Sequence, residues 1–488
     1  MRLVAFLPLI MFFVVACGDT APDPPTQSTA AASPSATAQG RAQTPVPTNT
    51  AAPRPTMTPV PGPTMTPVPA PTPEPSPTFA PGAVILPTVA ISSPTAVTTD
   101  PLMQSLDAAG LLASTLRDLA LSHPLDREFI TREELQVRLR EEFEEETDEI
   151  YKEQELYATL GILEEETDYY ELLLTMYGEG VTGFFDTEEE KMYVVTDTSE
   201  VGPHVELTYA HEFTHGLQQQ HFDIESLIDS VEDNNDQRLA LRALIEGDAT
   251  LLESLYYFER LTEEEQVEVQ QAAQSTSLDA YRSAPYVVRR TFAFPYVEGP
   301  QFVISLFLPL QSWHFIDLAY EDYPLSTEQI LHPERYTAGE EPVEVVLPDV
   351  AGALGLEWSQ LEINTLGEFF LLTYLESGLD PDRASAAADG WGGDRYSLLK
   401  GPEDESLMVS LITWDSEEDA LEFHGAFLEF MQQRTGADWE LAEGEGMGQV
   451  MELVGQRIFL GLDGSDTLLI LAPDLATLEA ARQAVQDL

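Results

Sequence analysis

Two of the chain's eight histidines stand four residues apart, in the run His211-Glu212-Phe213-Thr214-His215. On an α-helix, residues at this spacing project from one face. Two neutral imidazoles can then share one Zn²⁺, and the intervening Glu212 can reach water bound to the metal. Because the metal lowers the pKa of that water toward ~7, Glu212 would accept its proton and pass it to a leaving amine. The alternative is a polar amphipathic helix whose two histidines are hydrogen-bonded within the protein.

A catalytic zinc needs a third protein ligand and one open position, and the sequence offers two candidates. Glu246 lies among apolar residues of the next expected helix, where a buried carboxylate is costly unless it is paired or binds a metal. His221 lies ten residues after His211, but an unbroken helix turns it about 120° away from the face of His215. We therefore expect Glu246 to be the third ligand and His221 to be a polar residue near the end of its helix.

The Glu246 helix is expected to begin after the polar turn of residues 233–236. Its small residues Ala243 and Gly247 stand one turn apart. They predict that this helix packs closely on the histidine helix.

These residues resemble the gluzincin-type H-E-x-x-H metallopeptidases. They are similar, more closely, to a bacterial group with H-E-x-x-H-x-L-Q-x-Q-H-F followed by an E-G-D-A helix. The resemblance implies a mostly helical zincin-like core, zinc held by His211, His215 and Glu246, and Glu212 as general base and acid. The matching residues are 211–222, 246–249, 294–299, 326–333 and 390–394.

One position departs from the pattern of the thermolysin-like members, in which E-x-x-x-D would place an aspartate at residue 250. This chain has Thr250 there. Asp248 is the remaining candidate for a hydrogen-bond partner of a ligating histidine, although its helical phase relative to Glu246 is unfavourable.

Two residues outside the cluster, Tyr296 and His332, could donate a hydrogen bond to the oxyanion of the tetrahedral intermediate. The alternatives are a core aromatic residue for Tyr296 and a turn residue before Pro333 for His332. Residues 326–333 also have helix-cap character, so this run is compatible with a purely structural role.

The body of the chain is expected to be an α+β protein in three parts. Residues 101–200 are predicted to be mainly helical, with a capping box of Thr131 and Glu134, and to end in a β-hairpin. Residues 201–385 form the expected metallopeptidase core. Residues 386–488 form a small α+β domain, expected to be ferredoxin-like.

Within the C-terminal domain, Trp391 to Asp394 is expected to be a tight loop, because its surroundings are acidic and no lysine follows to make a phosphate site. Apolar periodicity then predicts a strand at 407–414 and a helix from 415 to about 434. A hairpin around residues 463–466 and a last helix complete the domain.

The first 17 residues predict a bacterial lipoprotein signal peptide. An apolar run follows Arg2. As a helix this run would be about 20 Å long, which is shorter than the ~30 Å hydrocarbon core of a membrane. The run ends in Val14-Val15-Ala16-Cys17, which resembles a lipobox, and Cys17 is the only cysteine. An ordinary signal peptide is the alternative. The expected location is the bacterial cell envelope, outside the cytoplasm, with lipidation of Cys17.

Residues 18–100 are rich in proline and threonine and are expected to be a disordered linker. The acidic residues lie mainly in the remaining body, and the formal net charge of the chain is −62. Such a body repels phosphate backbones and anionic lipid. We therefore expect no nucleic-acid partner, and membrane contact only through the lipid anchor.

The sequence thus predicts a lipid-anchored zinc metallopeptidase, a hydrolase that cleaves a peptide or protein substrate by a Glu212-activated, zinc-bound water. The alternative is a non-catalytic surface lipoprotein that keeps the metal for stability and binds a partner. Calcium binding by the acidic surface is a third possibility, but no D-x-[DN]-x-[DN]-G loop is present.

Overall fold

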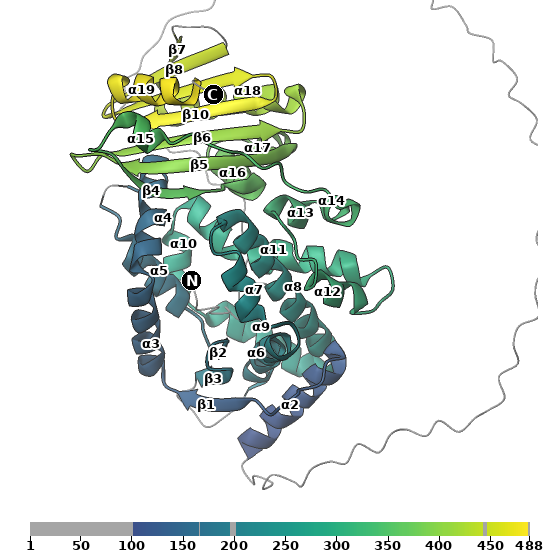
Figure 1. The fold of residues 1–488 in the computed structure, drawn as a ribbon. Helices are drawn as coiled ribbons and strands as arrows, with labels where there is room; N and C mark the ends of the chain where they lie inside the picture. The colour runs from purple at the N-terminus through teal and green to yellow at the C-terminus, as the bar shows by residue number, and fades with distance from the viewer. Residues whose placement is uncertain (1–100, 165, 196–201, 443–446, 487–488) are drawn as a thin grey trace, which may run out of the picture. The chain divides into compact units, whose positions relative to one another are not determined.

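A computed structural model describes residues 101–486, apart from 165, 196–201 and 443–446. The signal peptide predicted for residues 1–17, the lipidation site Cys17 and the linker of 18–100 lie outside the described residues. The described residues form a mixed α+β structure, as the sequence predicts (Figure 1). None of the described helices is long and apolar enough to cross a membrane.

The two histidines lie on α6 (Pro203–Phe222), an unbroken helix with proline in its first turn. Helix α6 packs against α2 (Pro101–Arg117) and α8 (Asn235–Arg260). Helix α8 begins at the N-cap Asn234, whose side chain accepts a hydrogen bond from the backbone of Gln237. The turn predicted to start this helix is therefore confirmed.

Helix α8 packs most closely against α11 (Tyr286–Phe307). A Cβ atom on Gly247 would lie 2.4 Å from the carbonyl oxygen of Gly299, and a Cβ on Gly299 would lie 2.2 Å from that of Ala243. Helix α8 packs on the histidine helix as predicted, but its small residues Ala243 and Gly247 face α11. The interface between α6 and α8 is filled instead by imidazole and carboxylate side chains, which need more space between the backbones.

A small sheet with the strand order β1-β3-β2 lies beside α6. Its strands are β1 (Asp126–Ile130), β2 (Gly183–Asp186) and β3 (Lys191–Val195). Strands β2 and β3 form the predicted hairpin, and β1 pairs with β3 in parallel. Phe185, Met192 and Val194 face the core around α6, whereas Phe184 and Tyr193 face the opposite cluster. The strand order places β2 at an edge of the sheet, where it contacts the histidine helix.

The capping box predicted before α3 is present, because Thr131 accepts from the backbone of Glu134 and the Glu134 carboxylate accepts from the backbone of Thr131. The other helices of the helical part are α3 (Arg132–Glu145), α4 (Thr147–Thr159), α5 (Tyr169–Gly178), α7 (Ile224–Ser230), α9 (Glu263–Ser275), α10 (Asp279–Ser283), α12 (His314–Ala319), α13 (Thr327–Leu331) and α14 (Pro333–Ala338).

The C-terminal part is built on a seven-stranded sheet with the order β4-β5-β6-β10-β9-β8-β7, whose neighbouring strands are all antiparallel. The strands are β4 (Ser359–Asn364), β5 (Trp391–Lys400), β6 (Ser406–Trp414), β7 (Trp439–Leu441), β8 (Met447–Leu453), β9 (Gln456–Asp463) and β10 (Asp466–Ala472). The predicted strand at 407–414 and the hairpin around 463–466 are confirmed.

Residues 391–394 begin β5, so the prediction of a tight loop there is wrong. The turn lies just before them, at Gly390, whose φ is +83°. Asp394 accepts hydrogen bonds from the backbone of Leu366 and Gly367 at 2.9 and 2.8 Å. These bonds fix the strand against the start of α16 (Gly367–Glu376).

The helices around this sheet do not follow the expected ferredoxin-like arrangement, in which both helices cover one face. Leu469 and Leu471 of β10 pack in the cluster that contains α18 (Glu417–Thr435), whereas Ile470 packs with α19 (Leu475–Gln486). Because successive strand residues point to opposite faces, the two helices lie on opposite faces. Helices α15 (Val350–Leu354) and α17 (Pro381–Ala388) complete this part.

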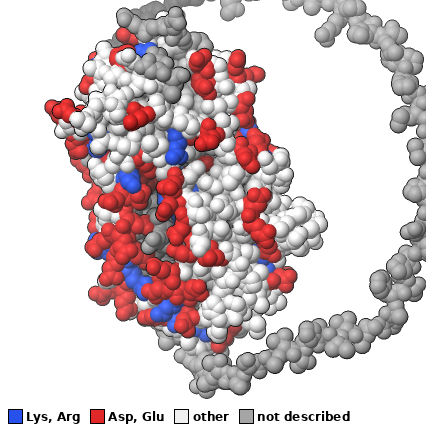
Figure 2. Space-filling view, in the orientation of Figure 1, with Lys and Arg blue, Asp and Glu red and all other residues white. Residues whose placement is uncertain are grey.

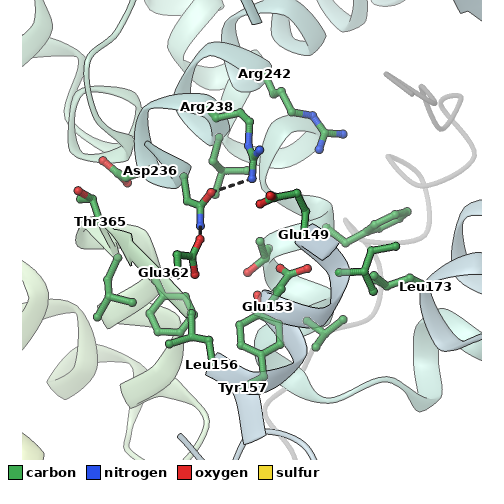
Figure 3. Close-up of a pocket in the computed structure, with 18 of the residues that line it drawn as sticks. Glu149, Glu153, Leu156, Tyr157, Leu173, Asp236, Arg238, Arg242, Glu362 and Thr365 are labelled. Atoms are coloured by element: carbon green, nitrogen blue, oxygen red, sulfur yellow. Dashed lines mark hydrogen bonds between the residues drawn. The ribbon is translucent and has the colours of Figure 1, made fainter. Parts of the chain in front are cut away.

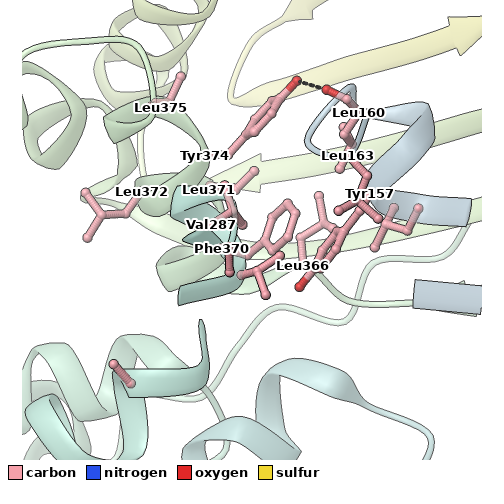
Figure 4. Close-up of a cluster of buried hydrophobic side chains, with 14 of the residues drawn as sticks. Tyr157, Leu160, Leu163, Val287, Leu366, Phe370, Leu371, Leu372, Tyr374 and Leu375 are labelled. Carbon is pink, nitrogen blue, oxygen red and sulfur yellow. Dashed lines mark hydrogen bonds between the residues drawn. The ribbon is translucent and has the colours of Figure 1, made fainter. Parts of the chain in front are cut away.

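One hydrophobic core joins the helical part to the sheet part. Tyr157 of α4 stacks on Phe370 of α16, with ring centroids 6.1 Å apart, and the Tyr374 hydroxyl donates to the carbonyl of Leu160 at 2.8 Å (Figure 4). Strand β4 also joins the sheet before residue 386, where the sequence placed the last boundary. The described residues accordingly belong to one compact unit.

Candidate metal centre

The three expected ligands converge between α6 and α8. His211 Nε2 lies 3.3 Å from Glu246 Oε2, and His215 Nε2 lies 3.7 Å from the same oxygen. One ligand atom from each residue lies within 4.8 Å of the other two. All three side chains are at most 1% exposed. The structure therefore brings His211, His215 and Glu246 together as the sequence predicts.

Glu253, which the sequence analysis did not single out, holds His211 from its other side. Its Oε2 lies 3.2 Å from His211 Nδ1, and its side chain is fully buried. Glu246 and Glu253 are seven residues apart, which is nearly two helical turns, so both face α6. Thr250 stands where the resemblance expects an aspartate, and Glu253, almost one turn later, carries the carboxylate that contacts the imidazole. The seven-residue spacing of two acids among apolar residues of one helix is the sequence pattern that could have predicted the role of Glu253.

His215 is held by Gln218, one turn further along α6. The Gln218 Oε1 accepts from His215 Nδ1 at 2.7 Å, and its Nε2 donates to Asp248 Oδ2 at 3.0 Å. Asp248 also accepts from Arg117 Nε at 2.7 Å and from the hydroxyl of Tyr320 at 2.9 Å. Asp248 was expected to be a direct partner of a histidine, but it supports His215 through Gln218.

Glu212 points from α6 toward the edge strand β2. Its Oε2 accepts a hydrogen bond from the backbone N–H of Phe185 at 3.0 Å. Its Oε1 is buried and has no hydrogen-bond partner among the described residues. Burial raises the pKa of Glu212 well above its usual value, and the nearby carboxylates of Glu246 and Glu253 raise it further. One carboxylate oxygen is thus held by the backbone while the other keeps its capacity to accept a proton.

The pKa values of the two histidines are shifted in opposite directions. Burial alone would lower the pKa of His211, but the hydrogen bonds to Glu246 and Glu253 raise it well above its usual value. Burial lowers the pKa of His215, and the neighbouring His211 lowers it further. The carboxylates of Glu246 and Glu253 therefore favour a positive charge at His211, which lies between them.

Tyr296 of α11 is also part of the cluster. Its hydroxyl donates to Glu246 Oε1 at 2.7 Å. In this position it holds the carboxylate that His211 and His215 face. Tyr296 was expected to donate to an oxyanion. In this structure its hydroxyl donates to Glu246, the expected third ligand.

His332 lies elsewhere, at the end of α13. Its Nε2 is 2.9 Å from Glu368 Oε1 of α16. The start of α13 is bonded to the start of α8, because Thr327 donates its backbone N–H to Asp236. Asp236 and Glu246 are ten residues, or roughly 15 Å, apart along α8. The structure thus does not place His332 among the residues around His211, and the prediction of a catalytic role for His332 finds no support in the geometry.

His221 is exposed near the end of α6, and its Nε2 contacts the carbonyl oxygen of Ala120 at 2.7 Å. Because α6 is unbroken, His221 points away from the cluster, as the sequence predicts.

The residues of the cluster could hold a divalent metal ion. Three carboxylates, those of Glu212, Glu246 and Glu253, are fully buried around two imidazoles. Burying several negative charges is strongly unfavourable unless a cation or protons neutralise them. Two imidazole nitrogens and one carboxylate oxygen are the donor set that zinc takes in many hydrolases.

Comparison with known protein families finds a match only in the C-terminal sheet part. A family model described as a domain of unknown function (DUF8575) matches residues 358–482. The match begins just before β4 and ends within α19, so the metal cluster lies outside it. No curated protein and no solved structure matches the chain.

Proposed function

We propose that the protein is a zinc-dependent peptidase, with His211, His215 and Glu246 as the metal ligands. The observation that carries the proposal is the convergence of these three side chains beside Glu212, which has one oxygen available to accept a proton. When bound, zinc would supply a Lewis acid that polarises the peptide carbonyl and acidifies water.

The residues around the proposed ligands each have a separate task. Glu212 accepts a proton from the attacking water and passes it to the leaving amine. Glu253 and Gln218 hold the imidazoles of His211 and His215 by their Nδ1 atoms, so that each Nε2 faces Glu246. Tyr296 orients Glu246 from α11.

A second candidate function is a metal-stabilised surface protein without catalysis. The observation that favours it is the complete burial of the side chains in the cluster, since a catalytic zinc keeps an open position for its substrate. Both candidates keep the expected lipid anchor at Cys17 and the extracytoplasmic location as parts of the proposal.

The substitution Glu212→Gln separates the two candidates. It keeps the size of the side chain and the hydrogen bond from Phe185, but it removes the base. We expect the variant to keep its zinc and to lose peptide cleavage by at least about a hundredfold. Cleavage of a mixed peptide library by the wild type and the variant is the measurement. Equal turnover by the two proteins contradicts the proposed role of Glu212, and zinc binding without cleavage by either favours the second candidate.

A further inference from the structure

A cavity of about 180 Å³ lies between α4, α8, α11 and the start of the sheet part. Glu149 and Glu153 of α4 and Arg238 and Arg242 of α8 are among its lining residues (Figure 3). A single water needs about 10–15 Å³ of such space, so the cavity is large enough for a long side chain. Aromatic residues form much of its wall: Tyr157, Tyr169, Tyr177, Phe292, Phe370 and Tyr396.

The cavity approaches the proposed metal centre through Arg242. This residue stands one turn before Glu246 on α8, so their backbones are about 6 Å apart. Arg242 is hydrogen-bonded to Tyr177, and its charge is coupled to Tyr177, Tyr296 and Glu246. Arg242 thus lines the cavity and also interacts with Glu246, one of the proposed ligands.

A wider cleft of about 1220 Å³ opens beside the cavity, and Glu146, Glu149, Ile228, Arg238 and Glu362 line both spaces. Twelve acidic residues and three basic ones line the cleft. Acidic side chains also dominate the face of the molecule that carries α3 and α4 (Figure 2). Phe185, whose backbone binds Glu212, is another lining residue of the cleft. The cleft beside the cavity is therefore strongly negative, which attracts cationic peptides from a distance.

Glu153 lines the cavity beside Tyr157 and Tyr169. Tyr157 and Tyr169 are hydrogen-bonded to its carboxylate, and among the described residues no ion pair involves it. Its burial raises the pKa of the carboxyl, and the charge of Arg238 lowers it only in part. Arg238 itself donates to Asn235 Oδ1 at 2.7 Å. A carboxylate without a contacting cation, surrounded by aromatic rings, is suited to an incoming ammonium or guanidinium group.

We propose that this cavity binds a lysine or arginine side chain of the peptide substrate, with Glu153 as its counter-ion. The proposal rests on the proposed function, because it takes the ligand to be a peptide. The aromatic walls pack against the aliphatic stem, and the acidic cleft guides the rest of a basic peptide toward the metal centre. The aromatic walls of the cavity distinguish this site from an ordinary solvated acidic surface, which has no walls to desolvate a bound cation.

The test measures binding, so that it does not depend on turnover. The full chain with Glu212→Gln is titrated with fluorescent decapeptides that differ at one central position: arginine, lysine, leucine or citrulline. Citrulline has nearly the shape of arginine without the charge. We expect the arginine and lysine peptides to bind at least about tenfold more tightly than the citrulline peptide, and Glu153→Gln to abolish this ratio.

The matched control is Glu232→Gln, an exposed acid that lines the wider cleft and not the cavity. This change should leave most of the ratio intact. Glu153→Gln should unfold at the same or a higher temperature than its parent, because it removes a desolvated carboxylate and can still accept from the tyrosines. An unchanged ratio in the folded Glu153→Gln protein, or equal binding of arginine and citrulline peptides by the parent, overturns the proposal.

The two proposals fail in different ways. Selective binding of basic peptides without cleavage by the wild type contradicts the peptidase and leaves the cavity proposal standing. Cleavage of library peptides with no enrichment of lysine or arginine near the cut supports the peptidase and overturns the cavity proposal.

Discussion

Glu253 gives the proposed metal centre a support that can be tested by one substitution. Because its carboxylate contacts Nδ1 of His211, it fixes the ring and keeps Nε2 directed at Glu246. We expect Glu253→Gln to weaken zinc binding by about 10–100-fold, since partners of this kind contribute that much to metal affinity. Competition with a chromophoric chelator measures the affinity. Glu259→Gln, an exposed position on the same helix, is the control, and equal affinities for the two variants would contradict the assigned role.

Residue types and spacing predicted the three side chains that meet between α6 and α8, but not all of the side chains that hold them in place. His211, His215 and Glu246 were identified because imidazoles four apart and a lone acid in an apolar helix are local patterns. Gln218 and Glu253 were not identified, because their roles depend on the rotation of α6 against α8. The partner of His332 likewise comes from α16, which is distant in the sequence.

At the scale of elements, the packing of α8 on α11 positions Glu246 and its partner Tyr296. We expect Gly299→Ala to destabilise the protein by roughly 1–3 kcal/mol, because its new Cβ would overlap the carbonyl of Ala243 and push the helices apart. The control is Gly425→Ala on α18, where the nearest atom to a Cβ is Arg383 Nη2 at 3.5 Å. That change should stabilise its helix by up to about 1 kcal/mol. Urea denaturation measures both, and equal midpoints for the two variants would refute the close approach of α8 and α11.

Asp236 joins the start of α8 to α13 by accepting from Thr327, and burial raises its pKa to about 8. The folded protein therefore keeps this proton up to about pH 8, whereas the unfolded chain releases it near pH 4. Between these values the folded state binds more protons, so stability falls as the pH rises. We expect the free energy of unfolding to drop more between pH 5 and pH 8 in the wild type than in Asp236→Asn. Urea titrations of both proteins at the two pH values measure it, and parallel losses would show that Asp236 does not titrate in this way.

The elements of the C-terminal part were largely predictable, because strand alternation and helical periodicity are local. The strand at 407–414, the following helix and the last hairpin lie where the pattern places them. The wrong prediction of a loop at residues 391–394 has a physical reason. Glycine in this strand lets a neighbouring backbone approach closely, because a Cβ on Gly393 would lie 2.3 Å from the carbonyl oxygen of Val343. The face that each helix covers depends on the whole sheet and could not be read from one segment.

At the scale of the whole molecule, the net charge of −62 should limit stability. Like charges crowded on one body repel, and salt screens them over about 10 Å at 0.1 M. We expect the melting temperature to rise by several degrees between low salt and about 0.3 M sodium chloride. Differential scanning calorimetry at fixed pH measures it. The same titration with a sodium salt of another simple anion controls for specific chloride binding, and a falling melting temperature would contradict the expectation.

We propose that α6 and α8 together hold one catalytic divalent metal ion. Elemental analysis of the purified full chain, after removal of loosely bound ions, tests it most directly. We expect one zinc per chain in the wild type and in His332→Ala, and a loss of zinc in His215→Ala with the helical circular dichroism spectrum retained. A wild type without bound metal, or a His215→Ala protein that keeps its zinc, would contradict it.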